Sequence, residues 1–222
     1  MKILIAGDSW GCGCWKDDKN IHRGLELFLQ IKGHTVTNLS VGGYSNAQIY
    51  RSLKTVYLPD YDYVFLFYTN PFRDLLSDNL YSKYFDVPDY SVNYKDVLKI
   101  YDDLSSHAYA MFDSLNHPIH MIGGHHKLED TSLTKNLISF IPSVREMFYT
   151  DYVQPKIIYV STVFKDYLKK FDKDTIDVLY ETYNVHDNLQ NIQRDYFYPD
   201  GYHLNVNGHL VLSKHIEEFM NR

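Results

Sequence analysis

Three residues near the two ends of the chain have the types needed for nucleophilic catalysis. Ser9 comes shortly after the apolar run 3–6, and Asp200 stands three residues before His203 near the other end. A serine hydroxyl becomes a useful nucleophile when an imidazole takes its proton and a carboxylate orients that imidazole. These residues therefore predict acyl-transfer chemistry of the esterase type.

The elements that must position these residues alternate between strand and helix patterns. Runs with the length and the β-branched or aromatic content of strands are 2–6, 34–40, 61–68, 118–123 and 156–162. Helical patterns cover 21–33, 46–57, 92–116, 174–193 and 208–220, with Asn46 and Asn207 as expected N-caps. Residues 124–155 have weak periodicity. The alternation predicts an α/β fold, with helices on both faces of a central, mostly parallel five-stranded sheet.

Length and composition fit one such domain. The chain has 222 residues, 45% of them hydrophobic and 23% charged, so we expect a single domain over 1–222. A net charge of −6 without a dense Lys/Arg cluster argues against a nucleic-acid partner. The short apolar start does not match a signal peptide, and no run is long enough to cross a bilayer. We expect no membrane partner and, by default, a cytoplasmic location, although a mature secreted form or a particle component would look the same.

Cysteines and histidines give no pattern typical of a metal site. Cys12 and Cys14 are one residue apart, which suits neither a disulfide nor a zinc site without a second ligand pair. Four histidines gather in one stretch, without helical i, i+4 spacing or accompanying carboxylates: His117, His120, His125 and His126. The predicted chemistry needs no metal, and we expect no cofactor.

Three predicted strand ends carry polar or flexible residues. Ser9 lies beyond the first strand, Gly42 and Gly43 lie in the turn after the second, and Asn70 follows the third. In open α/β sheets, ligands bind in the crevice at the carboxyl ends of the strands. The three strand ends are therefore expected to converge on one crevice.

Four segments in this order resemble the SGNH, or GDSL-type, hydrolase superfamily. They are Gly7-Asp8-Ser9 as the nucleophile block, 38–43 as the glycine block, Asn70 as the asparagine block, and 200–203 as the closing block, over nearly the whole chain. The resemblance implies a three-layer α/β/α, flavodoxin-like fold. It also implies that Ser9 attacks an ester carbonyl, that His203 acts as general base and then general acid, and that Asp200 holds His203.

The resemblance further implies an oxyanion hole made of the Ser9 N–H, the Gly43 N–H and the Asn70 side-chain amide. Gly43 is preferred to Gly42 because it lies five residues after Asn38. Preorganised donors of this kind are often the largest catalytic contribution in acyl transfer.

The chain departs from the family pattern at the walls of the expected pocket. The asparagine block of the family usually reads Gly-x-Asn-Asp, whereas this chain has Tyr68-Thr69-Asn70-Pro71. Trp10 follows the serine in place of an aliphatic residue. Trp10, Tyr44 and Tyr68 are the expected substrate contacts, since aromatic rings can stack on sugars or enclose acyl chains. The adjacent residues 73 and 74, Arg and Asp, are expected either to shape the rim or to pair in a helix. His209 is expected on a helix face.

Other motif interpretations fit less well. Gly7-x-Ser9-x-Gly11 matches the nucleophile elbow of α/β-hydrolases, but only one strand precedes Ser9. In chymotrypsin-type proteases the histidine and aspartate precede the serine. A phosphate-binding loop would need a further glycine or a Gly-Lys-Ser/Thr sequence after Gly13.

We therefore expect a serine-dependent ester hydrolase acting on small acyl esters. Acetylated carbohydrate is the leading substrate, because the chain has no obvious long apolar lid or acyl tunnel. A lipase, thioesterase or lysophospholipase remains open, since members of the superfamily act on all these substrates. A non-catalytic glycan-binding module on the same fold is the alternative from another class, and the complete set of Ser9, Gly43, Asn70, Asp200 and His203 argues against it.

Overall fold

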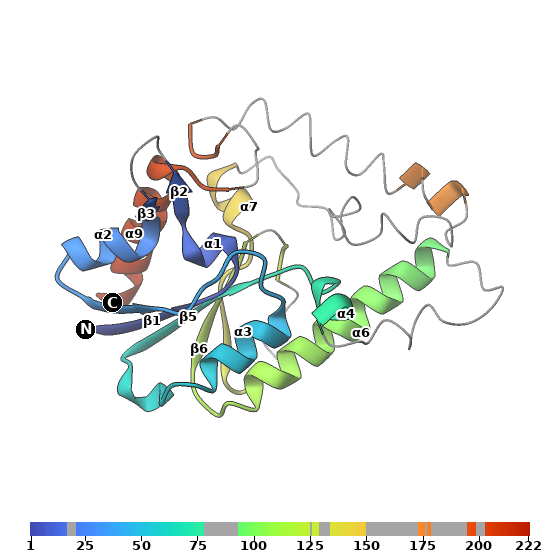
Figure 1. Cartoon of the computed structure of the whole chain (residues 1–222), viewed down its shortest axis with the longest axis horizontal. Helices are drawn as coiled ribbons and strands as arrows, with labels where there is room; N and C mark the ends of the chain where they lie inside the picture. Colours follow the sequence, from blue (N-terminus) through green and yellow to red (C-terminus); the bar gives the residue numbers. More distant parts are fainter. Residues whose placement is uncertain are drawn as a thin grey trace.

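A parallel sheet with helices on both faces forms the centre of the protein (Figure 1). This computed structural model describes residues 1–16, 21–77, 93–124, 126–128, 134–149, 173–175, 177–178, 195–198 and 203–222. The strands of the sheet are β1 (Lys2–Ala6), β4 (Thr35–Asn38), β5 (Tyr63–Tyr68), β6 (Ile119–Gly123) and β7 (Leu137–Ile141). Their order is β4-β1-β5-β6-β7, and each neighbouring pair is parallel. The predicted α/β fold is confirmed.

Four of the predicted strands match β1, β4, β5 and β6 to within a few residues. The fifth strand of the sheet is β7, which lies in the stretch 124–155 where the sequence pattern was weak. Its burial alternates irregularly and Ile138 is 42% exposed, so it lacks the continuous apolar run of a central strand. The strand predicted at 156–162 lies outside the described residues.

Alternate strand residues fill two cores, one on each face of the sheet. On one face, Ile3 and Ile5 of β1 pack with α2 (Gly24–Ile31) and α9 (Val206–Met220). On the other, Leu4 and Ala6 pack with α3 (Asn46–Leu53) and α6 (Tyr94–Asp113). This period of two follows from the pleat of a strand whose two faces are both buried.

Shorter elements flank the sheet. They are α1 (Ser9–Cys12), β2 (Cys14–Lys16), β3 (Ile21–Arg23), a 3₁₀ turn (Leu58–Asp60), α4 (Arg73–Ser77) and α7 (Val144–Phe148). β2 and β3 form an antiparallel hairpin, so the helix predicted over 21–33 begins only at Gly24. Most of the helix predicted over 174–193 lies outside the described residues. Of the helices described, none has the length and apolarity to span a membrane.

Both predicted N-caps were wrong by one or two positions. Ser45 caps α3 in a capping box with Gln48, and Asn205 caps α9 through the Gly208 N–H. Asn46 and Asn207 instead lie within the first turns of these helices.

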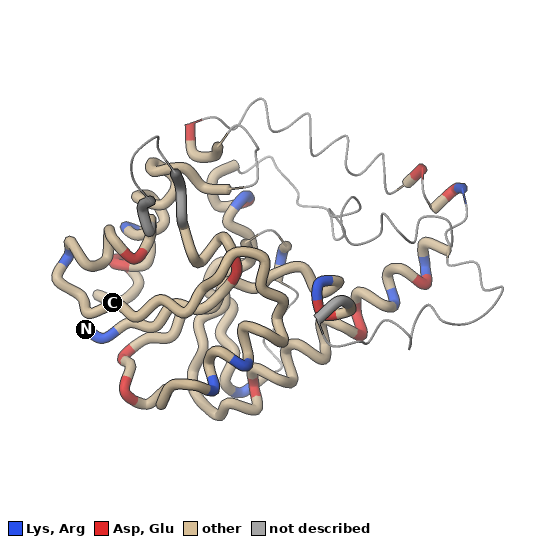
Figure 2. The backbone as a smooth tube through the Cα atoms, in the orientation of Figure 1, with Lys and Arg blue, Asp and Glu red and all other residues tan. Residues whose placement is uncertain are grey.

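Across the described chain, Lys and Arg are interspersed with Asp and Glu (Figure 2).

Candidate active site

Ser9 lies at the carboxyl edge of the sheet, at the start of the short helix α1. Asp8 caps this helix by accepting a hydrogen bond from the Trp10 N–H at 3.0 Å. Gly13 ends it in the left-handed conformation, where its N–H donates to the Ser9 carbonyl. Such a conformation favours glycine. The turn after β1 therefore fixes the backbone on both sides of the hydroxyl.

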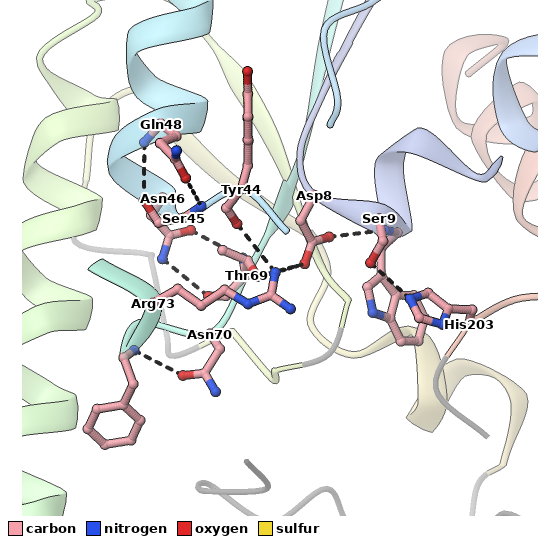
Figure 3. A network of polar contacts seen from close by, with 12 residues as sticks. Asp8, Ser9, Tyr44, Ser45, Asn46, Gln48, Thr69, Asn70, Arg73 and His203 are labelled. Carbon is pink, nitrogen blue, oxygen red and sulfur yellow. Dashed lines mark hydrogen bonds and ion pairs between the residues drawn. The ribbon is translucent and has the colours of Figure 1, made fainter. Parts of the chain in front are cut away.

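The Ser9 hydroxyl is hydrogen-bonded to the imidazole of His203. The distance from Ser9 Oγ to His203 Nε2 is 2.9 Å, between residues 194 positions apart (Figure 3). The His203 carbonyl accepts from the Tyr198 N–H at 2.8 Å, and Phe197 forms a bridge with Leu204. These contacts hold the histidine just before α9. Asp200, the third expected triad member, lies outside the described residues.

Asn70 follows β5 and is fully buried. Its Oδ1 accepts from the Phe72 N–H at 2.9 Å, while its Nδ2 atom has no hydrogen-bond partner within the described part of the chain. A buried amide donor without a partner is costly, and sites of function are where such donors are tolerated. Asn70 therefore has a donor available for a bound molecule.

The glycine loop lies beside Ser9. A Cβ atom added at Gly42 would be 4.0 Å from the Ser9 Cβ, whereas one added at Gly43 would meet nothing within 4 Å. Gly43 has φ +84°, in a turn closed by the Tyr44 N–H on the Val41 carbonyl. A positive φ at the third turn residue favours glycine. Asn38 attaches the start of the loop to α1 by donating to the Gly11 carbonyl at 3.1 Å.

A buried polar network lies on the other side of Asp8 (Figure 3). Its carboxylate, 1% exposed, accepts from the Thr69 hydroxyl at 2.6 Å and from Arg73 Nη1 at 2.8 Å. Arg73 Nη1 also donates to the Tyr44 carbonyl at 3.3 Å and to Thr69 Oγ1 at 2.9 Å. The sequence placed Arg73 near the site, but nothing in it indicated that Asp8 would be the partner.

Asp74, on α4, is bonded to the start of α3. Its carboxylate accepts from the Ala47 N–H at 2.8 Å and from the Asn46 amide at 3.2 Å. Asn46 also bonds both backbone groups of Thr69. Arg73 thus bonds Asp8 after β1, and Asp74 bonds the start of α3. From the sequence, these two residues were expected to shape the rim of the pocket or to pair with each other, and these partners were not included.

Of the three expected substrate aromatics, Trp10 lies beside the pair formed by Ser9 and His203, whereas Tyr44 and Tyr68 pack in the core on the other face of the sheet. Trp10 is 3% exposed, with its ring centroid 6.5 Å from that of His203 and 6.2 Å from that of Phe197. Tyr44 is partly buried against the core under α3 and α6, and its ring points away from Asp8 in Figure 3.

Tyr68 is 1% exposed and stacks on Tyr109 at 5.2 Å. Burial raises the pKa of its hydroxyl well above the usual value. As the last residue of β5 it faces the core rather than the crevice, which gives it a packing role in place of the expected substrate contact.

The described histidines of the 117–126 stretch lie apart from this site. His120 packs against Tyr63, Phe65 and Phe219, and burial lowers its pKa. Burial likewise lowers the pKa of His117. Among the residues that the structure describes, no three His, Cys, Asp or Glu side chains are grouped to hold a metal ion.

Comparison with known proteins gives structural similarities only. No protein-family model and no curated protein sequence matches the chain. The chain is similar to the psychrotrophic esterase EstA from Pseudoalteromonas sp., at 13% identity over 100% of this chain and 99% of that chain, with a TM-score of 0.43. It is also similar to the acetyl xylan esterase AlAXEase, at 13% identity over 99% of each chain, with a TM-score of 0.44. A third similar structure is the lipase/acylhydrolase from Enterococcus faecalis, at 15% identity over 99% of this chain and 94% of that chain, with a TM-score of 0.41.

The three solved structures are two esterases and a lipase/acylhydrolase. Similarity at these identities and TM-scores does not define the activity of this chain. The residues of the site itself have to support one.

Proposed function

We propose that this protein is a serine ester hydrolase in which Ser9 is the nucleophile. The observation that carries the proposal is the 2.9 Å hydrogen bond between Ser9 Oγ and His203 Nε2 at the carboxyl edge of the sheet. An imidazole at this distance can take the hydroxyl proton as the oxygen attacks.

The proposed reaction has two steps. Ser9 Oγ attacks the ester carbonyl carbon, and its proton passes to His203 Nε2. The negative charge that develops on the carbonyl oxygen is stabilised by the Asn70 amide, the Ser9 N–H and the Gly43 N–H. His203 then protonates the leaving alcohol. In the second step, water activated by His203 hydrolyses the acyl-enzyme, and Asp200 is the carboxylate proposed to orient the imidazole.

Small acyl groups, with acetyl on a carbohydrate as the leading case, are the proposed substrates. The ring of Trp10 supports this choice, because it fills the space next to His203 and packs on Gly124. A Cβ atom added at Gly124 would lie 2.9 Å from Trp10 Cγ. A bulky buried ring beside the nucleophile favours a short acyl group over a long chain.

Turnover of p-nitrophenyl acetate, butyrate and octanoate by the wild type, Ser9→Ala and the control Ser52→Ala tests the proposal. The Ser52 hydroxyl donates to the Ile49 carbonyl within α3, so its variant should behave as the wild type. We expect turnover that requires Ser9 and falls from acetyl to octanoyl. A rise toward octanoyl would favour a lipase-type activity instead.

Turnover that Ser9→Ala leaves unchanged would exclude Ser9 as the nucleophile. A third outcome is a wild type that hydrolyses neither these esters nor acetylated oligosaccharides. If the wild type and Ser9→Ala then bind glycans with equal affinity, the chain is a binding module rather than an enzyme.

A further inference from the structure

One side-chain nitrogen, Arg73 Nη1, connects three segments around Ser9. It contacts the Asp8 carboxylate at 2.8 Å, the Thr69 hydroxyl at 2.9 Å and the Tyr44 carbonyl at 3.3 Å (Figure 3). The Arg73 side chain is 20% exposed, whereas that of Asp8 is 1% exposed. This is an ion pair largely removed from water.

Each residue that Arg73 contacts is adjacent in sequence to one proposed oxyanion donor. Asp8 precedes Ser9, Thr69 precedes Asn70, and Tyr44 follows Gly43. The backbone of Arg73 adds a fourth link, because its N–H donates to the Asn70 carbonyl at 3.0 Å.

We propose that Arg73 is a positioning residue that holds the three oxyanion donors in one geometry. The inference rests on the proposed function, because it assigns Arg73 to the oxyanion hole of that same site. Three donors from three strand ends stabilise a developing charge only if their spacing is set before the reaction.

The charge of Arg73 also matters for the same step. A buried carboxylate beside Ser9 would repel the negative charge that develops on the substrate oxygen. Arg73 neutralises Asp8 at hydrogen-bond distance, so the donors act without that opposing charge.

Lysine would replace this arrangement only in part. All three contacts converge on Nη1 at the end of a long, planar side chain, whereas the lysine ammonium is a compact charge on a shorter, flexible stem that does not hold its nitrogen at the same point. Arg73→Lys should therefore keep the neutralisation of Asp8 and lose part of the bridge to Tyr44 and Thr69.

The experiment compares Arg73→Met, Arg73→Lys and the control Arg51→Met, an exposed arginine on α3. For Arg73→Met we expect kcat on p-nitrophenyl acetate to fall on the order of 10²-fold with KM little changed. Arg73→Lys should be intermediate, and Arg51→Met should match the wild type. Guanidinium ion added at a non-denaturing concentration should restore part of the activity of Arg73→Met.

A second readout does not depend on activity. In ¹H–¹⁵N NMR spectra, Arg73→Met should shift or broaden the signals of the Ser9 and Gly43 amides and of the Asn70 side-chain amide. Arg51→Met should leave these signals in place. If the three signals keep their positions in a folded Arg73→Met, the proposal is overturned, whether or not the protein hydrolyses esters.

The two proposals fail in different ways. A wild type without Ser9-dependent turnover, combined with the expected NMR changes, would refute the esterase and leave the positioning role of Arg73. Normal turnover by Arg73→Met would refute the positioning role and leave the esterase. If Arg73→Met does not fold, the same measurements are made on Arg73→Lys. In that variant, an unchanged kcat together with unchanged NMR signals of the Ser9, Gly43 and Asn70 amides would refute the positioning role of Arg73.

Discussion

His209 packs its imidazole directly against Gly13. A Cβ atom added at Gly13 would lie 3.0 Å from His209 Cε1 and 3.2 Å from Nε2. His209 is 2% exposed, and its pKa is lowered to about 3 by burial and, secondly, by His203. A neutral buried ring thus joins the end of α1, which begins with Ser9, to α9, which follows His203.

The buried ring of His209 predicts a loss of stability in mild acid. The unfolded chain binds a proton at this histidine below about pH 6.5, whereas the folded protein keeps it neutral down to about pH 3. Stability is therefore highest above pH 6.5 and falls through this window. Between pH 7.5 and pH 5, His209 should lower the free energy of unfolding by about 2 kcal/mol.

Urea unfolding at the two pH values measures this loss. His209→Gln should reduce the difference between them, whatever its effect on stability at pH 7.5. His215→Gln is the matched control, because His215 lies on the same helix and is exposed. An equal pH dependence in His209→Gln and the wild type would contradict the assignment of the loss to His209.

The available amide of Asn70 predicts a loss of kcat in Asn70→Asp. This variant keeps an acceptor for the Phe72 N–H, replaces the Nδ2 donor with an oxygen and adds a negative charge that also opposes the oxyanion. Removal of one oxyanion donor costs about 3–4 kcal/mol in the transition state, or a fall in kcat of roughly 10²–10³-fold. Steady-state kinetics on p-nitrophenyl acetate should show this fall with little change in KM.

Gln30→Ala serves as the control for Asn70, since the exposed Gln30 amide donates to Glu26 one turn earlier on α2. It should keep the wild-type kcat. If Asn70→Asp also keeps it, the third donor of the hole must be assigned elsewhere.

The close approach of Gly11 to its neighbours predicts destabilisation by Gly11→Ala. The added Cβ atom would lie 2.5 Å from Ser40 Oγ and 2.9 Å from Phe67 Cδ2. Overpacking of this kind costs about 1–3 kcal/mol. Thermal and urea unfolding at neutral pH should show the loss.

Gly42→Ala is the comparison for Gly11→Ala, because its Cβ atom would only reach ordinary contact with Ser9, at 4.0 Å. Its unfolding free energy should stay within about 0.5 kcal/mol of the wild type. The reverse order of stabilities would contradict the packing described at Gly11.

Three of the strands that could be predicted from the sequence are buried on both faces. β1, β5 and β6 have apolar runs, because nearly all their residues meet one of the two cores. β7 could not be located in this way. Two of its residues are exposed, and its polar Ser139 interrupts the apolar pattern.

Some features of the site could be predicted from short sequence motifs, whereas others depend on the packing of distant segments. Ser9 and His203 could be paired from their motifs, and the pairing needs no knowledge of packing. The cap of α3 could also be predicted from the sequence, since Ser45 and Gln48 have the spacing of a capping box. The contact of Arg73 with Asp8 spans 65 positions, and only the packing of β5 beside β1 brings these side chains together.

The parallel order of the sheet has a consequence for the protein during its synthesis. Ser9 emerges from the ribosome 194 positions before His203, which is positioned by contacts next to α9. A growing chain therefore holds a serine without its proton acceptor. The proposed activity can begin only when α9 has docked against α2, so that chemical competence depends on a contact between segments far apart in the chain.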